Sequence, residues 1–90
     1  MNRKINLIRY SSKFERVYKK LSLKEKLIAE KREKIFRQNP FDPRLKTHKL
    51  KGKLKDKWSF SLTYSQRVLF NFYKDGEVIF YDIGDHKIYQ

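Results

Sequence analysis

The first 40 residues carry apolar side chains at helical spacing. A short apolar run at 5–10 predicts a first strand. Apolar positions three or four apart then predict two helices, over 12–21 and 22–38. Their apolar faces are Phe14, Val17, Tyr18 and Leu21 in the first helix, and Leu27, Ile28, Ile35 and Phe36 in the second.

The ends of both predicted helices carry recognisable signals. Ser12 with Glu15, and Ser22 with Glu25, have the spacing of a capping box, in which the serine hydroxyl and the glutamate carboxylate satisfy free backbone amides. Asn39-Pro40 ends the second helix, because the residue before a proline disfavours helical geometry. The two helices are therefore predicted to form a hairpin.

The second half of the chain changes to the two-residue period of strands. Apolar and small polar residues alternate strictly over 58–64, which indicates a half-buried strand. Two more strands are predicted at 67–73 and 78–83, joined by an Asp75-Gly76 turn and followed by a tail over 84–90. We therefore expect an α+β fold, in which an N-terminal helical hairpin packs on one face of a mainly antiparallel four-stranded sheet, with residues 1–90 forming one domain.

Alternation along the middle strand indicates which side chains the helices leave uncovered. Val68, Phe70 and Phe72 share one face and are expected in the core. Arg67 then points to the open face of the sheet, near its edge. The loop that precedes these strands is strongly basic, so a cationic surface site is predicted around Arg67.

The charge and length of the chain limit the functions that it could have. The chain has 23 Lys and Arg against 10 Asp and Glu, a net charge of +13, and all of the excess lies in residues 1–56. This charge favours a polyanionic partner: nucleic acid, an acidic protein or an anionic membrane surface. A chain of 90 residues buries only a thin core, which argues against a large internal substrate cavity.

Other classes are excluded by what the sequence lacks. It has no cysteine, which rules out disulfides and thiol nucleophiles and suits a reducing cytoplasm. No apolar run approaches the roughly 18 residues of a membrane span, and no secretory signal opens the chain. We therefore expect a cytoplasmic protein.

Two histidines are the candidate proton-transfer groups near neutral pH. His48 lies in the basic loop and His86 follows the last predicted strand, so both border the open face. The alternative is that each is an ordinary solvated histidine. Two histidines 38 residues apart with scattered carboxylates match no metal-ligand spacing, so no metal site is predicted.

The basic loop has a lysine at every second position around Gly52. The lysines alternate with the apolar anchors Leu50, Leu54 and Trp58, which favours phosphate binding over idle solvation. Trp58 and Tyr89 are candidates for stacking on unpaired bases, with a plain core role for Trp58 as the alternative. The lysines are Lys46, Lys49, Lys51, Lys53, Lys55 and Lys57.

The order of these motifs resembles that of the RelE superfamily of bacterial toxin–antitoxin ribonucleases, particularly its YoeB-like and YafQ-like branches. The resemblance is carried by His48-Lys-Leu-Lys-Gly52, Trp58, Arg67-Val-Leu-Phe70 and Ile83-Gly-Asp-His86, and it extends over nearly the whole chain. It implies a toxin that cleaves messenger RNA at the ribosomal A site, without a metal or other cofactor, by attack of a 2′-hydroxyl on the adjacent phosphate. It also implies an acidic antitoxin as partner.

The resemblance also implies residue roles. His48 occupies the position of the general base, Arg67 that of the arginine that stabilises the transition state, and His86 that of the general acid. Tyr89 is similar to the family's terminal aromatic residue, and Lys49, Lys51 and Lys53 would hold phosphates. Ser61 and Ser65 stand where the YafQ-like branch has a further histidine and aspartate, which departs from that branch.

Two other functions remain open on the same scaffold. One is a protein-binding toxin similar to the ParE branch, which acts on DNA gyrase and lacks the nuclease residues. The other is an RNA-binding module without catalytic activity, held to RNA by the same basic loop. Cleavage of RNA distinguishes the ribonuclease from both.

Overall fold

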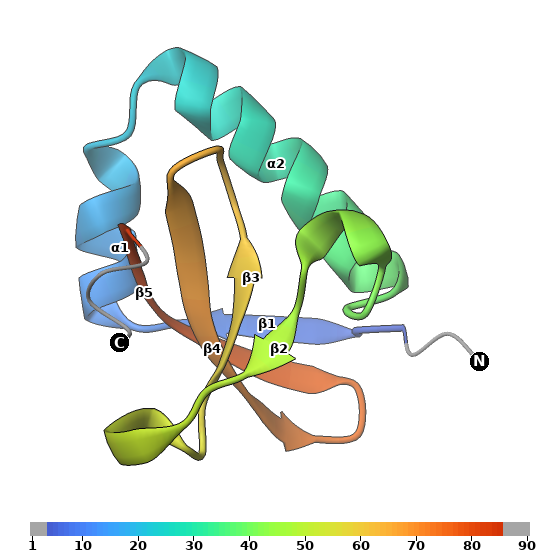
Figure 1. The fold of residues 1–90 in the computed structure, drawn as a ribbon. Coiled ribbons are helices and arrows are strands. Elements are labelled where there is room, and N and C mark those ends of the chain that lie inside the picture. The colour runs from blue at the N-terminus through green and yellow to red at the C-terminus, as the bar shows by residue number, and fades with distance from the viewer. Residues whose placement is uncertain (1–3, 86–90) are drawn as a thin grey trace.

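The computed structural model describes residues 4–85 as helices and 3₁₀ turns arranged around one sheet (Figure 1). The 3₁₀ turns η1 (Pro43–Leu45) and η2 (Gly52–Leu54) lie on either side of the shortest strand. In chain order the helices and strands are β1 (Leu7–Tyr10), α1 (Ser12–Lys19), α2 (Leu23–Gln38), β2 (His48–Lys49), β3 (Trp58–Ser61), β4 (Gln66–Lys74) and β5 (Glu77–Asp85).

The α+β class is confirmed, but the predicted four-stranded sheet is wrong in two respects. The sheet has five strands in the order β1-β5-β4-β3-β2, and β1 runs parallel to β5 while the other pairs are antiparallel. The additional strand β2 is only two residues long, too short to show any alternation. The parallel pair follows from the helical hairpin, which carries the chain away from β1 before the last strand returns beside it.

The helix caps agree with the sequence in one case of two. Ser22 and Glu25 form the predicted capping box, with hydrogen bonds of 2.8 and 3.1 Å. The box predicted for Ser12 is wrong, because Ser11 is the N-cap of α1 and accepts from the Phe14 amide. The Ser11 hydroxyl also donates to the Tyr81 carbonyl at 2.6 Å, which ties the start of α1 to β5. Neither helix in the described part of the chain is long and apolar enough to cross a membrane.

Strand β3 is shorter than the alternation suggests. It ends at Ser61, and the amides of Leu62 and Thr63 both donate to the Gln66 carbonyl to form a tight turn. The pairing of β4 with β5 also slips between Leu69 and Phe70, where a β-bulge adds one residue to β5. Both irregularities lie close to Arg67.

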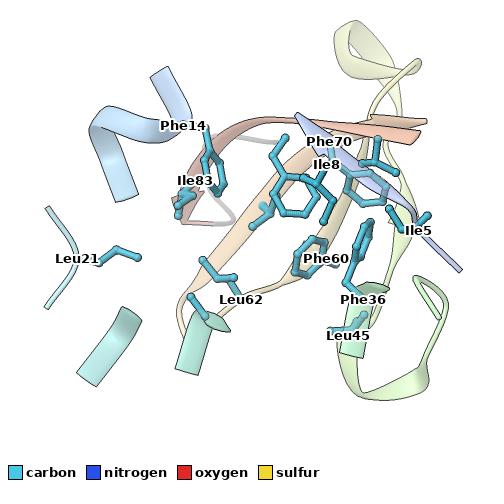
Figure 2. Close-up of a cluster of buried hydrophobic side chains, with 14 residues drawn as sticks. Ile5, Ile8, Phe14, Leu21, Phe36, Leu45, Phe60, Leu62, Phe70 and Ile83 are labelled. Atoms are coloured by element: carbon cyan, nitrogen blue, oxygen red, sulfur yellow. The ribbon is translucent and has the colours of Figure 1, made fainter. Parts of the chain in front are cut away.

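The core is an aromatic cluster in which Phe36 of α2 meets three strands at once (Figure 2). Its ring centroid lies 4.8 Å from that of Phe60 on β3, 5.1 Å from that of Phe70 on β4 and 5.3 Å from that of Phe80 on β5. All four side chains are essentially inaccessible to solvent. The helix therefore packs on one face of the sheet, as predicted.

The predicted apolar face of α2 needs one correction. Leu27 was expected in the core, but 53% of its surface is exposed, and Leu23 is 77% exposed. Ala29 takes the buried place instead. A small residue at this position lets the helix approach the sheet closely, so the buried stripe lies on the other side of α2 from the leucines.

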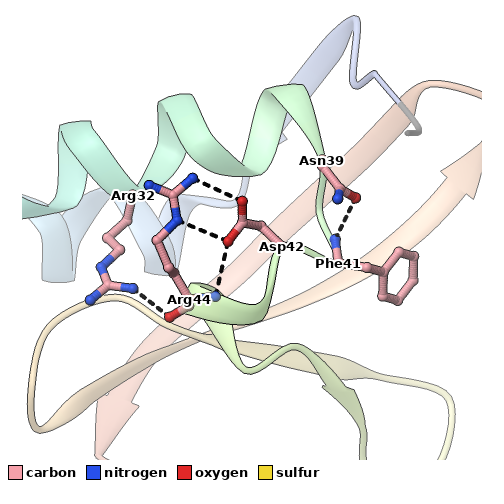
Figure 3. Close-up of polar contacts among 5 residues, drawn as sticks. All are labelled: Arg32, Asn39, Phe41, Asp42 and Arg44. Atoms are coloured by element: carbon pink, nitrogen blue, oxygen red, sulfur yellow. Dashed lines mark hydrogen bonds and ion pairs between the residues drawn. The ribbon is translucent and has the colours of Figure 1, made fainter. Parts of the chain in front are cut away.

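The connection from α2 to β2 is held by short polar contacts (Figure 3). Asp42 accepts from the backbone amide and the guanidinium of Arg44, each at 2.9 Å, and these hydrogen bonds lower the pKa of Asp42 to about 2. Arg32 of α2 donates to the Arg44 carbonyl at 2.6 Å. The fully buried Leu45 fixes the same segment to the core, so the polypeptide enters β2 at a defined point.

We predict that Phe36→Ala destabilises the protein by about 3–5 kcal/mol, because it leaves a cavity among three aromatic rings. Urea unfolding followed by circular dichroism measures this change. The matched control is Phe41→Ala, whose ring is 42% exposed and which is expected to cost much less. Equal losses for the two variants would contradict a central role for Phe36.

Candidate functional site

Strand register places a set of polar side chains on the face of the sheet opposite α2. Residues that lie directly opposite each other in an antiparallel pair point to the same face. Ser61 pairs with Arg67, which in turn pairs with Gly84. Since Phe60 and Val68 face the core, Arg67 and Ser61 face away from it. The prediction from alternation along this strand is confirmed.

Arg67 is half-buried on this face and held by one neighbour. Its Nη1 donates to the Ser61 hydroxyl at a long 3.4 Å. It forms no ion pair with a carboxylate among residues 4–85. Gly84 has no side chain, so nothing from that position covers the guanidinium on the β5 side. A guanidinium has five N–H donors, and those that Ser61 does not use remain for an anionic ligand.

His48 begins β2 at the edge of the sheet and pairs with Ser59, so its side chain lies on the same face as Arg67. Its Nδ1 lies 3.0 Å from the carbonyl oxygen of Lys46. A carbonyl oxygen only accepts hydrogen bonds, so Nδ1 carries the hydrogen and donates. In the neutral ring Nε2 is then a proton acceptor, and no residue among 4–85 hydrogen-bonds to it. Lys46 adopts a left-handed conformation, with φ of 53°, just before this point.

The register also sets the distance between these two groups. Ser59 and Ser61 are neighbours on one face of β3, and they pair with His48 and Arg67 respectively. His48 and Arg67 are therefore two strands apart across the sheet and two residues apart along the strand direction. This corresponds to roughly 12 Å between their Cα atoms. Both side chains are long enough to reach toward a group bound beside the half-buried Ser61, whereas Ser59 between them is fully buried. The fold thus brings together two of the three residues singled out as catalytic.

The third, His86, and the aromatic candidate Tyr89 lie outside the described residues. The described part of the chain ends at Asp85, which pairs with Gln66, the residue before Arg67. The last strand therefore finishes beside the Arg67 position.

The basic loop does not run as one extended stretch. Gly52, with φ of 71°, starts the turn η2, which interrupts the alternation of lysines. Leu50 is buried, so it anchors the loop as predicted. Five of the six lysines are exposed around this anchor: Lys46, Lys49, Lys51, Lys53 and Lys55.

The sixth lysine contacts an aromatic residue that sequence reasoning missed. Lys57 Nζ lies 4.0 Å from the centroid of the Tyr81 ring. Tyr81 stands beside the bulge of β5, between the buried residues Phe80 and Asp82. The sequence alternates along β5: Val78 and Phe80 face the core, so Ile79 and Tyr81 face the other way. This alternation could have placed Tyr81 on the open face.

Trp58 lies elsewhere. Its ring packs edge-on against Phe41 at 5.6 Å and Phe72 at 5.5 Å, beside the main core. This is the core role that the sequence left open as the alternative to base stacking. It places the indole on the face opposite to Arg67, so the indole is not available to a ligand bound beside Arg67.

Metal binding finds no support in the described residues, among which no group of three His, Asp or Glu side chains could hold an ion. One buried hydroxyl among them, that of Ser59, has no hydrogen-bond partner. Ser59 on β3 lies opposite His48 of β2 on one side and Leu69 of β4 on the other. Besides arginine, histidine, serine and lysine side chains, the register places Asn71 and Asp82 on this face, where Asp82 forms an ion pair with Lys13 at 3.1 Å.

Comparison with known proteins places this arrangement in a known fold. No protein-family model matches the sequence, and no curated protein matches it. Solved structures do match. The YoeB/ParE toxin from Agrobacterium tumefaciens is similar with a TM-score of 0.76 at 15% identity, over 90% of this chain and 99% of that one. YafQ from E. coli is similar with a TM-score of 0.65 at 18% identity, over 94% and 97%.

A third similar structure is a complex. The toxin–antitoxin complex RelBE2 from Mycobacterium tuberculosis matches with a TM-score of 0.73 at 15% identity, over 91% of this chain and 92% of that one. This chain has the fold of these toxins. The fold that the resemblance to the RelE superfamily implies is therefore confirmed.

The hydrogen bond between His48 and the Lys46 carbonyl predicts which nitrogen of the His48 ring carries the hydrogen. We predict that the neutral His48 ring carries its hydrogen on Nδ1, which donates to the Lys46 carbonyl. Long-range ¹H–¹⁵N NMR spectra distinguish this form from the Nε2–H form. A predominant Nε2–H ring at His48 would contradict the hydrogen bond to Lys46.

Proposed function

We propose that this chain is a RelE-superfamily toxin that cleaves messenger RNA on the ribosome, with residues 1–90 acting as one toxin domain in the cytoplasm. The observation that carries the proposal is the presence of Arg67 and His48 on one open face of a toxin fold. Arg67 has no carboxylate partner among the described residues, and His48 has a free Nε2. These are the properties required of a phosphate-binding cation and a general base.

In the proposed reaction, Nε2 of His48 takes the proton from a ribose 2′-hydroxyl. The 2′-oxygen then forms a bond to the adjacent phosphorus, and the bond from phosphorus to the 5′-oxygen breaks. His86 donates a proton to that leaving oxygen. The products are a 2′,3′-cyclic phosphate, which can open to a 3′-phosphate, and a 5′-hydroxyl. The step needs no oxidant or cofactor.

Arg67 is assigned to the charge that develops on the phosphate. A guanidinium already held near Ser61 needs little rearrangement to bind the extra negative charge in the transition state, and such preorganised donors are a large source of catalysis. The exposed lysines Lys49, Lys51 and Lys53 are assigned to flanking phosphates, where they add affinity without reading sequence. We also assign to Tyr81 the base-stacking role first considered for Trp58, on the ring face that Lys57 does not cover.

The catalytic assignment predicts that His48→Gln, Arg67→Ala and His86→Ala each slow cleavage about 10²- to 10⁴-fold, with little change in stability. Cleavage of mRNA on programmed ribosomes measures the effect. The matched control is Arg9→Ala, which removes an arginine from the first strand at the far edge of the sheet and should leave the rate within about twofold.

Full activity of Arg67→Ala and His86→Ala together would overturn the assignment. A gyrase supercoiling assay on the same preparations distinguishes the gyrase-directed alternative. Salt-sensitive RNA binding without cleavage under any condition would identify the RNA-binding module.

We also propose an acidic antitoxin as partner. RelBE2 of Mycobacterium tuberculosis is a toxin–antitoxin complex, and the +13 charge of the present chain favours a polyanionic protein that covers its basic loop. Co-expression with the acidic protein encoded beside it should yield a complex that weakens as salt is raised. Failure to co-purify at low salt would contradict the partnership.

A further inference from the structure

Asp82 is a nearly buried carboxylate that the proposed reaction does not use. It lies on β5 and is only 7% exposed. The register pairs Asp82 with Leu69, so its side chain lies on the open face of the sheet. A carboxylate there repels the phosphates of RNA, and burial removes the water that would screen it. A negative charge therefore borders the proposed RNA site.

The cation that compensates this charge comes from helix α1. Nζ of Lys13 lies 3.1 Å from Oδ2 of Asp82. The other carboxylate oxygen, Oδ1, accepts from the backbone amide of Ile83 at 2.8 Å. The Asp82 side chain is almost covered, so salt screens this ion pair less than it screens a pair between two exposed groups.

Helix α1 brings Lys13 to this place because its first turn lies against the end of β5 (Figure 1). Strand β1 pairs with β5 only as far as Phe80. Beyond that point Ser11 takes over the edge of β5: its amide donates to the Phe80 carbonyl at 3.0 Å, and its hydroxyl donates to the Tyr81 carbonyl at 2.6 Å. These two hydrogen bonds hold the turn that contains Lys13 beside Asp82.

Arg67 is a diagonal neighbour of Asp82 on the open face. It pairs with Gly84, which lies two residues after Asp82 on β5. Diagonal neighbours in an antiparallel pair have Cα atoms roughly 7–8 Å apart, a distance that an arginine side chain can span. Within the described part of the chain, however, Asp82 pairs with Lys13, and Arg67 pairs with no carboxylate.

Lys13 and Arg67 are therefore competitors for one carboxylate. A buried carboxylate that loses its cation costs several kcal/mol, so it captures another cation within reach. A guanidinium binds a carboxylate through two parallel hydrogen bonds, and it binds a phosphate with the same donors. An Arg67 that is paired with Asp82 would be withdrawn from RNA.

We propose that Lys13 is a positioning residue of the ribonuclease site. By holding Asp82, it keeps the guanidinium of Arg67 free for the phosphate. In this role Lys13 acts on the RNA only through Asp82 and Arg67. The inference rests on the proposed function, because it assigns Lys13 to the site through the residue that binds the transition state.

The experiment removes the lysine alone and then together with the carboxylate. Lys13→Met should slow mRNA cleavage on programmed ribosomes about 10- to 100-fold, because Arg67 is then bound to Asp82. Adding Asp82→Asn to this variant should restore the rate to within about threefold of wild type, since the amide oxygen still accepts from Ile83 but no longer attracts a guanidinium. A merely structural role for the ion pair predicts no such rescue.

Two further variants of α1 serve as controls. Lys19→Met removes an exposed lysine from the last turn of the same helix, with the same change in net charge, and should leave the rate within about twofold. Lys13→Arg keeps a cation beside Asp82 and should retain most of the activity.

A second measurement does not depend on cleavage. A crystal structure of Lys13→Met should show the guanidinium of Arg67 within about 4 Å of the Asp82 carboxylate. Full activity of Arg67→Ala would defeat the proposed function, but this structure would still test the competition for Asp82.

Three results would overturn the inference. One is a wild-type rate for Lys13→Met when Arg67→Ala is slow. Another is a slow Lys13→Met variant that Asp82→Asn does not restore. The third is a structure of Lys13→Met in which Arg67 stays in place and Asp82 pairs instead with Lys57, the lysine that lies over the neighbouring Tyr81 ring.

Discussion

The contact of Phe36 with three strands determines which face of the sheet is free for chemistry. Because its ring packs against Phe60, Phe70 and Phe80, α2 is fixed over the face that these residues share. Every residue that alternates with them must then point outward. Arg67 lies on the open face, half-buried, for this reason, and a helix docked on that face would bury an unpaired guanidinium at a cost of several kcal/mol. The apolar pattern thus positions the polar site.

Sequence patterns were sufficient where a feature repeats over several residues. Alternation along β4 identified Val68 and Phe70 as core and Arg67 as outward-facing, and helical spacing located both helices. The patterns failed where a feature is short or depends on a distant partner. A strand of two residues has no period, and the parallel pairing of β1 depends on the return of β5 from the far end of the chain.

The same limit explains the errors in detail. Local rules favour Ser12 as the cap because Glu15 lies at capping-box spacing from it, but Ser11 is the cap, and its hydroxyl also reaches the Tyr81 carbonyl on β5. Leu27 has the right spacing for the core, but Ala29 allows the closer approach of α2, so the leucine remains outside. For the site, the sequence identified His48 and Arg67 but gave no distance between them. That distance is set by β2, which the sequence did not reveal.

The position of His48 shows how a proton acceptor is prepared by ordinary folding contacts. Asn39-Pro40 ends α2, the Asp42–Arg44 contacts make a compact turn, and the buried Leu45 fixes it to the core. The left-handed Lys46 then aims its carbonyl at Nδ1 of His48. These hydrogen bonds and apolar contacts stabilise the connection between α2 and β2. The same contacts orient the His48 ring so that Nε2 has no partner among the described residues. The general base proposed at this position therefore requires no strained side chain and no buried charge.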